Sequence, residues 1–252
     1  MSNEIRPLLS LVIPAYNEAD RLPATIRRIE KHRRLWNFSS EIIIAVEPSE
    51  DETLALAESA AKKVPQLVVL THHEKRGKGF AVRSGMLRAR GDFIFFTDAD
   101  LSTPLEDLDA SLQRFRKDRS IQVIVGNRQH PETRILVHQN PGREWMGKVF
   151  NRFAQTMTGL RIRDTQCGFK GFRHRAAKEI FGRQRIDGFS FDVEVLLLAR
   201  AMGFSTVEVP VHWTNSAASR VRVFRDSVVM LSDLFRVRRL VKKTLYEFPY
   251  KR

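Results

Sequence analysis

Two carboxylates one residue apart, Asp98 and Asp100, are the residues of this sequence best placed to do chemistry. They follow the apolar run 93–96, whose continuous hydrophobicity is typical of a strand inside a sheet that is covered on both faces. Open α/β sheets bind ligands just beyond the carboxyl ends of their strands, and residues two apart in an extended segment point to the same side. Carboxylate oxygens in this number suit Mg²⁺ or Mn²⁺, with a diphosphate completing the coordination.

A structural interpretation accounts for the residues that follow this pair. Asp100 or Ser102 can cap a helix that carries Pro104 and two acidic residues in its first turn. This interpretation explains the run 102–107 but gives Asp98 no role. Because an isolated Asp-x-Asp is a common pattern, both interpretations stay open at this point.

Composition restricts the partners and the compartment. The 252-residue chain has a formal net charge of +14, which implies an anionic partner such as nucleic acid, anionic lipid or a phosphorylated substrate. We expect no nucleic-acid binding, because basic residues interleaved with aromatics on a stacking platform are not evident. A single cysteine, Cys167, excludes an internal disulfide framework. No run approaches the ~20 apolar residues of a membrane span and no signal-peptide pattern is present, so we expect a cytoplasmic protein.

Strand and helix patterns alternate along the first half of the chain. We expect apolar strands at residues 9–14, 41–46, 67–70, 93–96 and 121–125. Helical patterns cover residues 22–35, 53–64, 79–89 and 105–115. This order predicts an α/β fold with a mostly parallel sheet and helices on both faces. We expect one domain over residues 1–218 and a distinct tail over residues 219–252.

Three loops are expected to meet at one edge of this sheet: residues 14–18, residues 47–51 and the loop of Asp98 and Asp100. Between them lies the basic segment 72–79, just before a helix. Its amides and cations can hold a phosphate, although such a glycine-containing turn is often only a solvated connector. It has neither the Walker spacing nor the Gly-x-Gly-x-x-Gly pattern, which argues against a P-loop NTPase and a Rossmann dehydrogenase.

Several runs of the sequence together resemble glycosyltransferase family 2. They are Val12–Glu18, Arg76–Gly79, Asp98–Asp100, Gly126–Arg128 and Arg163–Lys170, extended by Phe191–Glu194 and Val209–Trp213. Within that family the chain looks most like dolichyl-phosphate β-glucosyltransferases and bacterial polyprenyl-phosphate relatives. The Asp-Thr-Gln-Cys-Gly-Phe-Lys run is the more specific signal, because the first strand with its loop and the Asp-x-Asp are general to the superfamily.

The resemblance implies a GT-A fold, an inverting reaction, a nucleoside-diphosphate sugar donor and a divalent metal, Mg²⁺ or Mn²⁺, bound by Asp100. The positions that match donor-binding residues are Pro14, Ala15, Tyr16, Glu18, Arg76, Lys78 and Asp98. Those that match the sugar and acceptor region are Asp164, Gln166 and Lys170.

The acceptor determines which further groups the reaction needs. A polyprenyl or dolichyl phosphate is already ionised near neutral pH, so cations that hold the phosphate matter more than a general base. The candidates are Arg128, Arg134, Arg143 and Arg220, and Arg128 also belongs to the expected catalytic set with Asp98, Asp100 and Asp192.

A sugar hydroxyl as acceptor would instead require a base, and Asp192 is the expected one. The structural interpretation of Asp192 and Glu194 is a helix first turn that follows Ser190. A family 2 transferase that acts on a saccharide or a small molecule therefore stays open as an alternative.

One position departs from the family pattern. Relatives usually carry Val-Asp-Asp-Gly-Ser-x-Asp after the second strand, where an Asp reads the base, whereas this chain has Val46-Glu47-Pro48-Ser49. Glu47 keeps a carboxylate one methylene longer that can still accept hydrogen bonds from a base N–H, so we count it among the expected nucleotide-sugar-binding residues, whereas Pro48 removes a backbone donor. We favour UDP-glucose as the donor and leave GDP-mannose open as a second possible donor. A catalytically silent relative that only binds a nucleotide sugar stays open as an alternative function.

Two segments are expected to serve the acceptor. Residues 127–153 are predicted to form a long loop that closes over the donor and the acceptor phosphate. The tail is predicted to form a basic amphipathic helix, with apolar residues at helical spacing and cations at 225, 236, 238, 239, 242 and 243. Such a helix can lie peripherally on the anionic cytoplasmic face of a membrane and also pack its apolar face on the domain.

Overall fold

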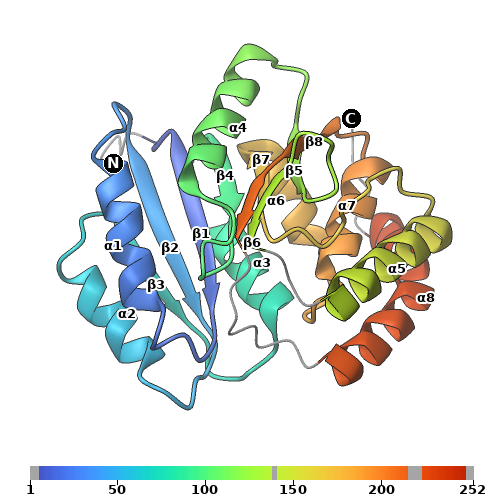
Figure 1. Cartoon of the computed structure of the whole chain (residues 1–252), viewed down its shortest axis with the longest axis horizontal. Helices are drawn as coiled ribbons and strands as arrows, with labels where there is room; N and C mark the ends of the chain where they lie inside the picture. The colour runs from blue at the N-terminus through green and yellow to red at the C-terminus, as the bar shows by residue number, and fades with distance from the viewer. Residues whose placement is uncertain (1–5, 138–140, 215–222, 248–252) are drawn as a thin grey trace.

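The computed structural model describes residues 6–137, 141–214 and 223–247. A seven-stranded sheet with strand order β3-β2-β1-β4-β7-β5-β8 forms its centre (Figure 1). The strands are β1 (Leu9–Ala15), β2 (Ser40–Val46), β3 (Leu67–Thr71), β4 (Phe93–Phe96), β5 (Val123–Asn127), β7 (Lys170–Arg173) and β8 (Thr206–Pro210). β7 pairs antiparallel with both β4 and β5, and the remaining pairings in this sheet are parallel. β6 (Arg134–Val137) and β9 (His212–Thr214) form a separate parallel pair.

Helices cover both faces of the sheet. They are α1 (Leu22–Arg33), α2 (Thr53–Ala61), α3 (Lys78–Arg88), α4 (Leu105–Lys117), α5 (Pro141–Thr158), α6 (His174–Arg183), α7 (Phe191–Ala201) and α8 (Val223–Glu247). One apolar core packs α1, α2 and α4 on one face of the sheet. A second apolar core packs α3, α5, α6, α7 and α8 on the other face. The predicted α/β class, with a mostly parallel sheet between two helical layers, is therefore confirmed.

The antiparallel strand β7 is, like β8, an element of the sheet that the sequence pattern did not predict. Its sequence, Lys-Gly-Phe-Arg, has two cations and a glycine, yet it lies between β4 and β5 with Phe172 fully buried. Gly171 is required there, because a Cβ at this position would lie 2.3 Å from Cε1 of Phe95. The register places Lys170 beside Phe96, the last residue of β4 before the acidic loop.

The prediction of a long loop over residues 127–153 is wrong for most of its length, because β6 and the larger part of helix α5 lie within this segment. Glycines 142 and 147 concealed a helical pattern in the sequence. Apolar residues recur every four positions at Trp145, Val149, Phe153 and Met157. Ala154 is buried, and the Phe153 ring lies 5.9 Å from that of Phe235 in α8. Packing against α8 therefore accounts for this helix.

The predicted tail helix is present as α8, which packs on α7 and α5 at one end of the molecule (Figure 1). Leu234, Val237 and Val241 are buried, whereas Phe235 is 63% exposed. The described cations of this helix, Arg236, Arg238, Arg239, Lys242 and Lys243, are all exposed. The proposed boundary at residue 218 and the side chain of Arg225 lie outside the described residues. Within the described part of the chain, no helix is both long and apolar enough to cross a bilayer.

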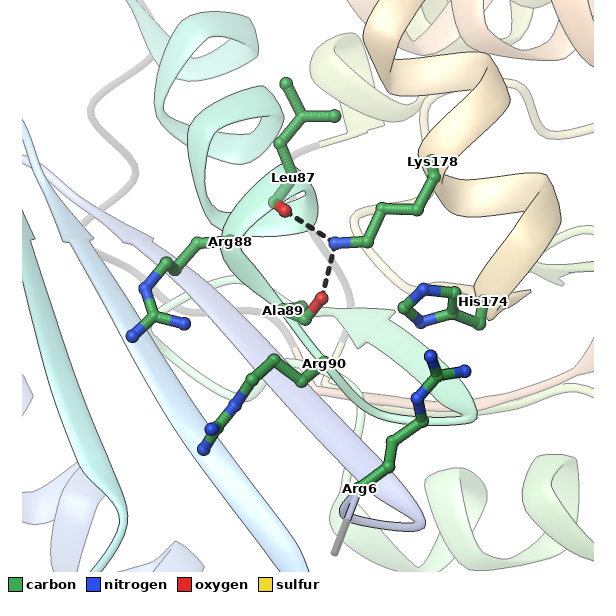
Figure 2. Close-up of a pocket in the computed structure, with 7 residues that line it drawn as sticks. All are labelled: Arg6, Leu87, Arg88, Ala89, Arg90, His174 and Lys178. Carbon is green, nitrogen blue, oxygen red and sulfur yellow. Dashed lines mark hydrogen bonds between the residues drawn. The ribbon is translucent and has the colours of Figure 1, made fainter. Parts of the chain in front are cut away.

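A cavity of about 290 Å³ lies beyond the amino ends of β1 and β4, away from the acidic loop (Figure 2). Lys178 of α6 reaches into it and donates to the carbonyl oxygens of Met86 at 2.9 Å, Leu87 at 2.5 Å and Ala89. These carbonyls belong to the carboxyl end of α3, where the helix itself offers no donors. The cavity therefore encloses a helix cap that holds α6 on α3.

Candidate active site

The loops after β1 and β2 are joined by hydrogen bonds. The Asn17 N–H donates to Ser49 Oγ at 3.1 Å, and the Glu50 N–H donates to Asn17 Oδ1 at 2.8 Å. The Glu18 N–H donates to Thr53 Oγ1 at 2.7 Å. Asn17 has a φ of 52°, a left-handed conformation that asparagine tolerates better than most residues. Two of the three loops predicted to converge are thus in direct contact.

The loop of Asp100 joins them through Arg21, a residue that the sequence analysis missed. Arg21 donates to both oxygens of Glu18 at 2.7 Å, and its Nη1 lies 3.9 Å from Asp100 Oδ2. The i, i+3 spacing of Glu18 and Arg21 was the available signal. The Asp100 Oδ1 atom accepts the Ser102 N–H at 2.9 Å. Asp100 and Ser102 do not cap α4, because Pro104 occupies the N-cap position without a side-chain hydrogen bond.

Asp98 forms an ion pair with Lys78, the first residue of α3. The Lys78 Nζ lies 2.5 Å from Asp98 Oδ1, with the two side chains 22% and 38% exposed. Burial alone would lower the pKa of Lys78, but the carboxylates of Asp98, Asp192 and Asp100 outweigh it, so the pKa is raised. Lys78 therefore carries a positive charge at the end of β4.

The segment 163–170 supports Asp98 from the other side. Gly168 packs so closely on the Asp98 carboxylate that a Cβ would lie 2.0 Å from Oδ2. Any side chain at 168 would therefore displace Asp98. This contact explains why the Asp-Thr-Gln-Cys-Gly-Phe-Lys run has a glycine at position 168.

Lys170 and Asp192 form a buried pair beneath this surface. The Lys170 Nζ is 2.5 Å from Asp192 Oδ1 and 2.7 Å from the Cys167 carbonyl oxygen, and both side chains are almost fully buried. Burial raises the pKa of Asp192, while Lys170 and Lys78 act in the opposite direction. The charges of Asp98, Lys78, Asp192 and Lys170 thus alternate in sign across the site. Asp192 lies in the first turn of α7, and Ser190 makes no capping hydrogen bond.

Arg128 is held by Asp164 in a two-pronged ion pair. Its Nε is 2.7 Å from Oδ2 and its Nη2 is 2.9 Å from Oδ1 of a fully buried carboxylate. Burial alone would raise the pKa of Asp164, but Arg128 outweighs it and holds the pKa below its usual value. Asn151, which the sequence analysis missed inside the segment taken as a loop, donates to the same carboxylate at 3.3 Å. The guanidinium carbon of Arg128 lies 5.6 Å from the Trp213 ring centroid.

Gln166 and Cys167 are adjacent in this segment, and only Gln166 has a polar group without a partner in the described part of the chain. Burial, together with the Asp164 charge, raises the pKa of the Cys167 thiol to about 12, so this cysteine is not a nucleophile near neutral pH. The Gln166 Nε2 is buried without a hydrogen-bond partner in the described part of the chain. The Gln166 amide therefore has a donor that no hydrogen bond within the described part of the chain uses.

The remaining predicted residues lie farther out or outside the described set. Pro14 and Ala15 end β1, and the Tyr16 ring centroid lies 3.7 Å from Lys75 Nζ. Arg76 pairs with Asp187 at 2.6 Å. Arg134 is exposed on β6, whereas the side chain of Arg143 and all of Arg220 lie outside the described residues. Over residues 6–137, 141–214 and 223–247, no three His, Cys, Asp or Glu side chains gather into a self-sufficient metal site.

Comparison with known sequences gives the site a context. The model of "Glycosyl transferase family 2" matches residues 10–181. A dolichyl-phosphate beta-glucosyltransferase of Dictyostelium discoideum is 34% identical over 241 residues, which cover 91% of this chain and 73% of the relative. The human protein of the same name is 31% identical over 242 residues, covering 91% of this chain and 74% of the relative.

Solved structures share the fold at low sequence identity. Glucosyl-3-phosphoglycerate synthase from Mycobacterium tuberculosis, crystallised with Mn²⁺, UDP and phosphoglyceric acid, matches with a TM-score of 0.63 and 15% identity over 98% of this chain and 80% of that one. Mannosyl-3-phosphoglycerate synthase from Rubrobacter xylanophilus matches with a TM-score of 0.62 and 19% identity over 97% and 75% of the two chains. The predicted GT-A fold is confirmed.

The buried Arg128–Asp164 pair generates a stability prediction. Arg128→Met leaves the Asp164 carboxylate buried without its cation, so we expect a loss of about 3–5 kcal/mol in the free energy of unfolding. The double variant Arg128→Met/Asp164→Leu removes both charges and is expected to recover most of that loss. Urea denaturation of the two single variants and the double variant measures the coupling. Additive losses in the double variant would contradict this account.

Proposed function

The chain belongs to glycosyltransferase family 2, and on that basis we propose that it transfers glucose from UDP-glucose to a polyprenyl or dolichyl phosphate with inversion of the anomeric carbon. The observation that carries the proposal is the meeting of Asp98, Asp100 and Lys78 at the carboxyl end of β4, in a chain whose relatives are named dolichyl-phosphate beta-glucosyltransferases. Acidic residues and a cation at this edge are what a diphosphate needs.

The donor site that we propose lies where the three loops meet. Tyr16 and Glu18, with Pro14 and Ala15 behind them, surround the base and ribose. Lys78 has three donors, of which the bond to Asp98 uses one, so the others are available to the diphosphate. The structural neighbour crystallised with UDP supports a uridine nucleotide for this fold.

The carboxylates fit a divalent metal ion. Mg²⁺ in nucleotide sites is commonly held by one or two carboxylates, with phosphate oxygens and water completing the shell. Asp100 and Asp98 supply such oxygens, and the lack of a third acidic ligand among the described residues leaves positions for the diphosphate. When bound, Mg²⁺ or Mn²⁺ would neutralise charge on the leaving nucleoside diphosphate.

The surroundings of Asp192 support a phosphate as the acceptor. A general base needs a carboxylate that is free to take a proton, whereas Asp192 is buried and bonded to Lys170. This favours an acceptor that is already an anion over a sugar hydroxyl. An acceptor phosphate oxygen would attack the anomeric carbon while the bond from that carbon to the donor phosphate breaks. Arg128, fixed by Asp164, and the unpartnered Gln166 amide are the groups that we assign to the acceptor phosphate.

The membrane is the source of such an acceptor, and α8 presents a suitable surface. Its cations face outward beside Phe235 and Tyr246, which are 63% and 89% exposed. α5 lies alongside and exposes Val149 (Figure 1). Each cation near an anionic bilayer contributes about 1 kcal/mol of attraction. We therefore propose that the protein sits peripherally on a membrane through α8.

Removal of one charge tests the activity. Asp100→Asn is expected to lower the rate of glucolipid formation from UDP-glucose and polyprenyl phosphate in Mn²⁺ buffer by about 10²–10³-fold, because charge on the leaving group is no longer neutralised. Asp20→Asn, an exposed residue of the loop before α1, serves as the matched control and should keep the wild-type rate. Full activity of Asp100→Asn, or no glycolipid from the wild type with either UDP-glucose or GDP-mannose, would overturn the proposal.

Charge reversal tests the membrane surface. Arg239→Glu/Lys242→Glu on α8 is expected to weaken binding to anionic phospholipid vesicles at least about tenfold in cosedimentation, since the reversed charges are repelled by the bilayer. Arg27→Glu/Arg28→Glu on α1 changes the net charge equally at exposed positions elsewhere and should weaken binding far less. Equal losses in the two double variants would show that α8 is not the contact surface.

A further inference from the structure

Glu47 uses its carboxylate inside the protein. It follows β2 and is only 2% exposed. Its Oε2 accepts the N–H of Arg76 at 2.7 Å and the N–H of Gly77 at 2.8 Å. Its Oε1 is buried without a hydrogen-bond partner in the described part of the chain, 3.4 Å from Nδ1 of His72.

We propose that Glu47 is a positioning residue that clamps the backbone of Arg76 and Gly77, so that Lys78 meets Asp98, and that it does not read the nucleotide base. Both oxygens are enclosed, one by two amides and the other by the edge of a partly buried histidine ring. A base would therefore have to compete for atoms that the fold already uses. The effect on nucleotides rests on the proposed function, whereas the clamp itself does not.

The two hydrogen bonds from Glu47 hold a segment whose backbone includes a glycine with a positive φ. Gly77 has a φ of +122°, and a Cβ there would lie 2.8 Å from the Asp187 carbonyl oxygen. Two successive amides that converge on one buried anionic oxygen form charge-assisted hydrogen bonds, which are stronger than neutral ones. Lys78 is the next residue along the chain and reaches Asp98 at 2.5 Å. The backbone conformation that Glu47 fixes is thus the one in which the Lys78 side chain reaches Asp98.

The length of the side chain matters for this contact. An aspartate at position 47 would end about 1.5 Å short, the length of one carbon–carbon bond, and could not accept both amides.

His72 determines what else can replace the glutamate. Ser84 Oγ donates to the Ala81 carbonyl at 2.9 Å and lies 2.8 Å from His72 Nε2, and the ring hydrogen is on Nε2 or on Nδ1 according to the tautomer. In the tautomer with the hydrogen on Nε2, His72 Nδ1 can accept a hydrogen bond from a group at position 47. A glutamine can place its oxygen on the two amides and its NH₂ toward His72, so Glu47→Gln retains the clamp without the charge.

Amide hydrogen exchange at residue resolution, without any nucleotide, tests the clamp directly. The amides of Arg76 and Gly77 are expected to exchange at least about tenfold faster in Glu47→Ala and Glu47→Asp than in the wild type. In Glu47→Gln they should stay within about threefold of it. Unchanged exchange in Glu47→Asp would overturn the proposal, and so would loss of protection in a folded Glu47→Gln variant.

Titration calorimetry with UDP and GDP in Mn²⁺ buffer tests the second part of the proposal, that Glu47 does not read the nucleotide base. The clamp predicts that Glu47→Asp weakens both nucleotides by a similar factor, about 5–20-fold, and that Glu47→Gln stays near the wild type. A change of more than about fivefold in the ratio of the two affinities would show that Glu47 reads the base. If the wild type binds neither nucleotide, the proposed function fails, while the exchange result still decides whether the clamp exists.

Discussion

The ion pair between Lys78 and Asp98 joins the first residue of α3 to the loop after β4, and the site is arranged around it. Gly168 leaves room for the carboxylate, Glu47 fixes the backbone before the lysine, and Asp192 adds a second negative charge nearby. Each contact comes from a different part of the chain. The sheet matters for function because it brings the ends of β1, β2 and β4 to the same place.

Buried charges make this arrangement costly unless every charge is paired. Lys170 is fully buried, and so is Asp164; each is held by an opposite charge at hydrogen-bonding distance. Removal of one partner leaves a buried charge that can cost several kcal/mol, whereas the intact pair contributes little net stability. These pairs are therefore better explained as a means of fixing where Arg128 points and where the charges of Lys170 and Asp192 lie than as a source of stability. Such rigidity suits a site that must stabilise a leaving diphosphate without rearranging.

The sequence predicts the fold well where each segment carries its own signal. The run Phe93–Phe96 is a strand at the predicted bounds, because its apolar residues face both helical layers. β7 could not be predicted, since Lys-Gly-Phe-Arg becomes a strand only between two buried neighbours. For the site, carboxylates after strands predicted which loops converge. Burial and pairing were not predictable, because nothing local shows that Glu47 turns to the amides of Arg76 and Gly77.

The most direct test of the central claim is the affinity of Lys78→Met for UDP-glucose in Mn²⁺ buffer, measured by titration calorimetry beside the wild type. If the Lys78–Asp98 pair forms the diphosphate site, the variant should bind about a hundredfold more weakly, a difference of about 3 kcal/mol. An unchanged dissociation constant in the folded variant would contradict the account and place the donor elsewhere.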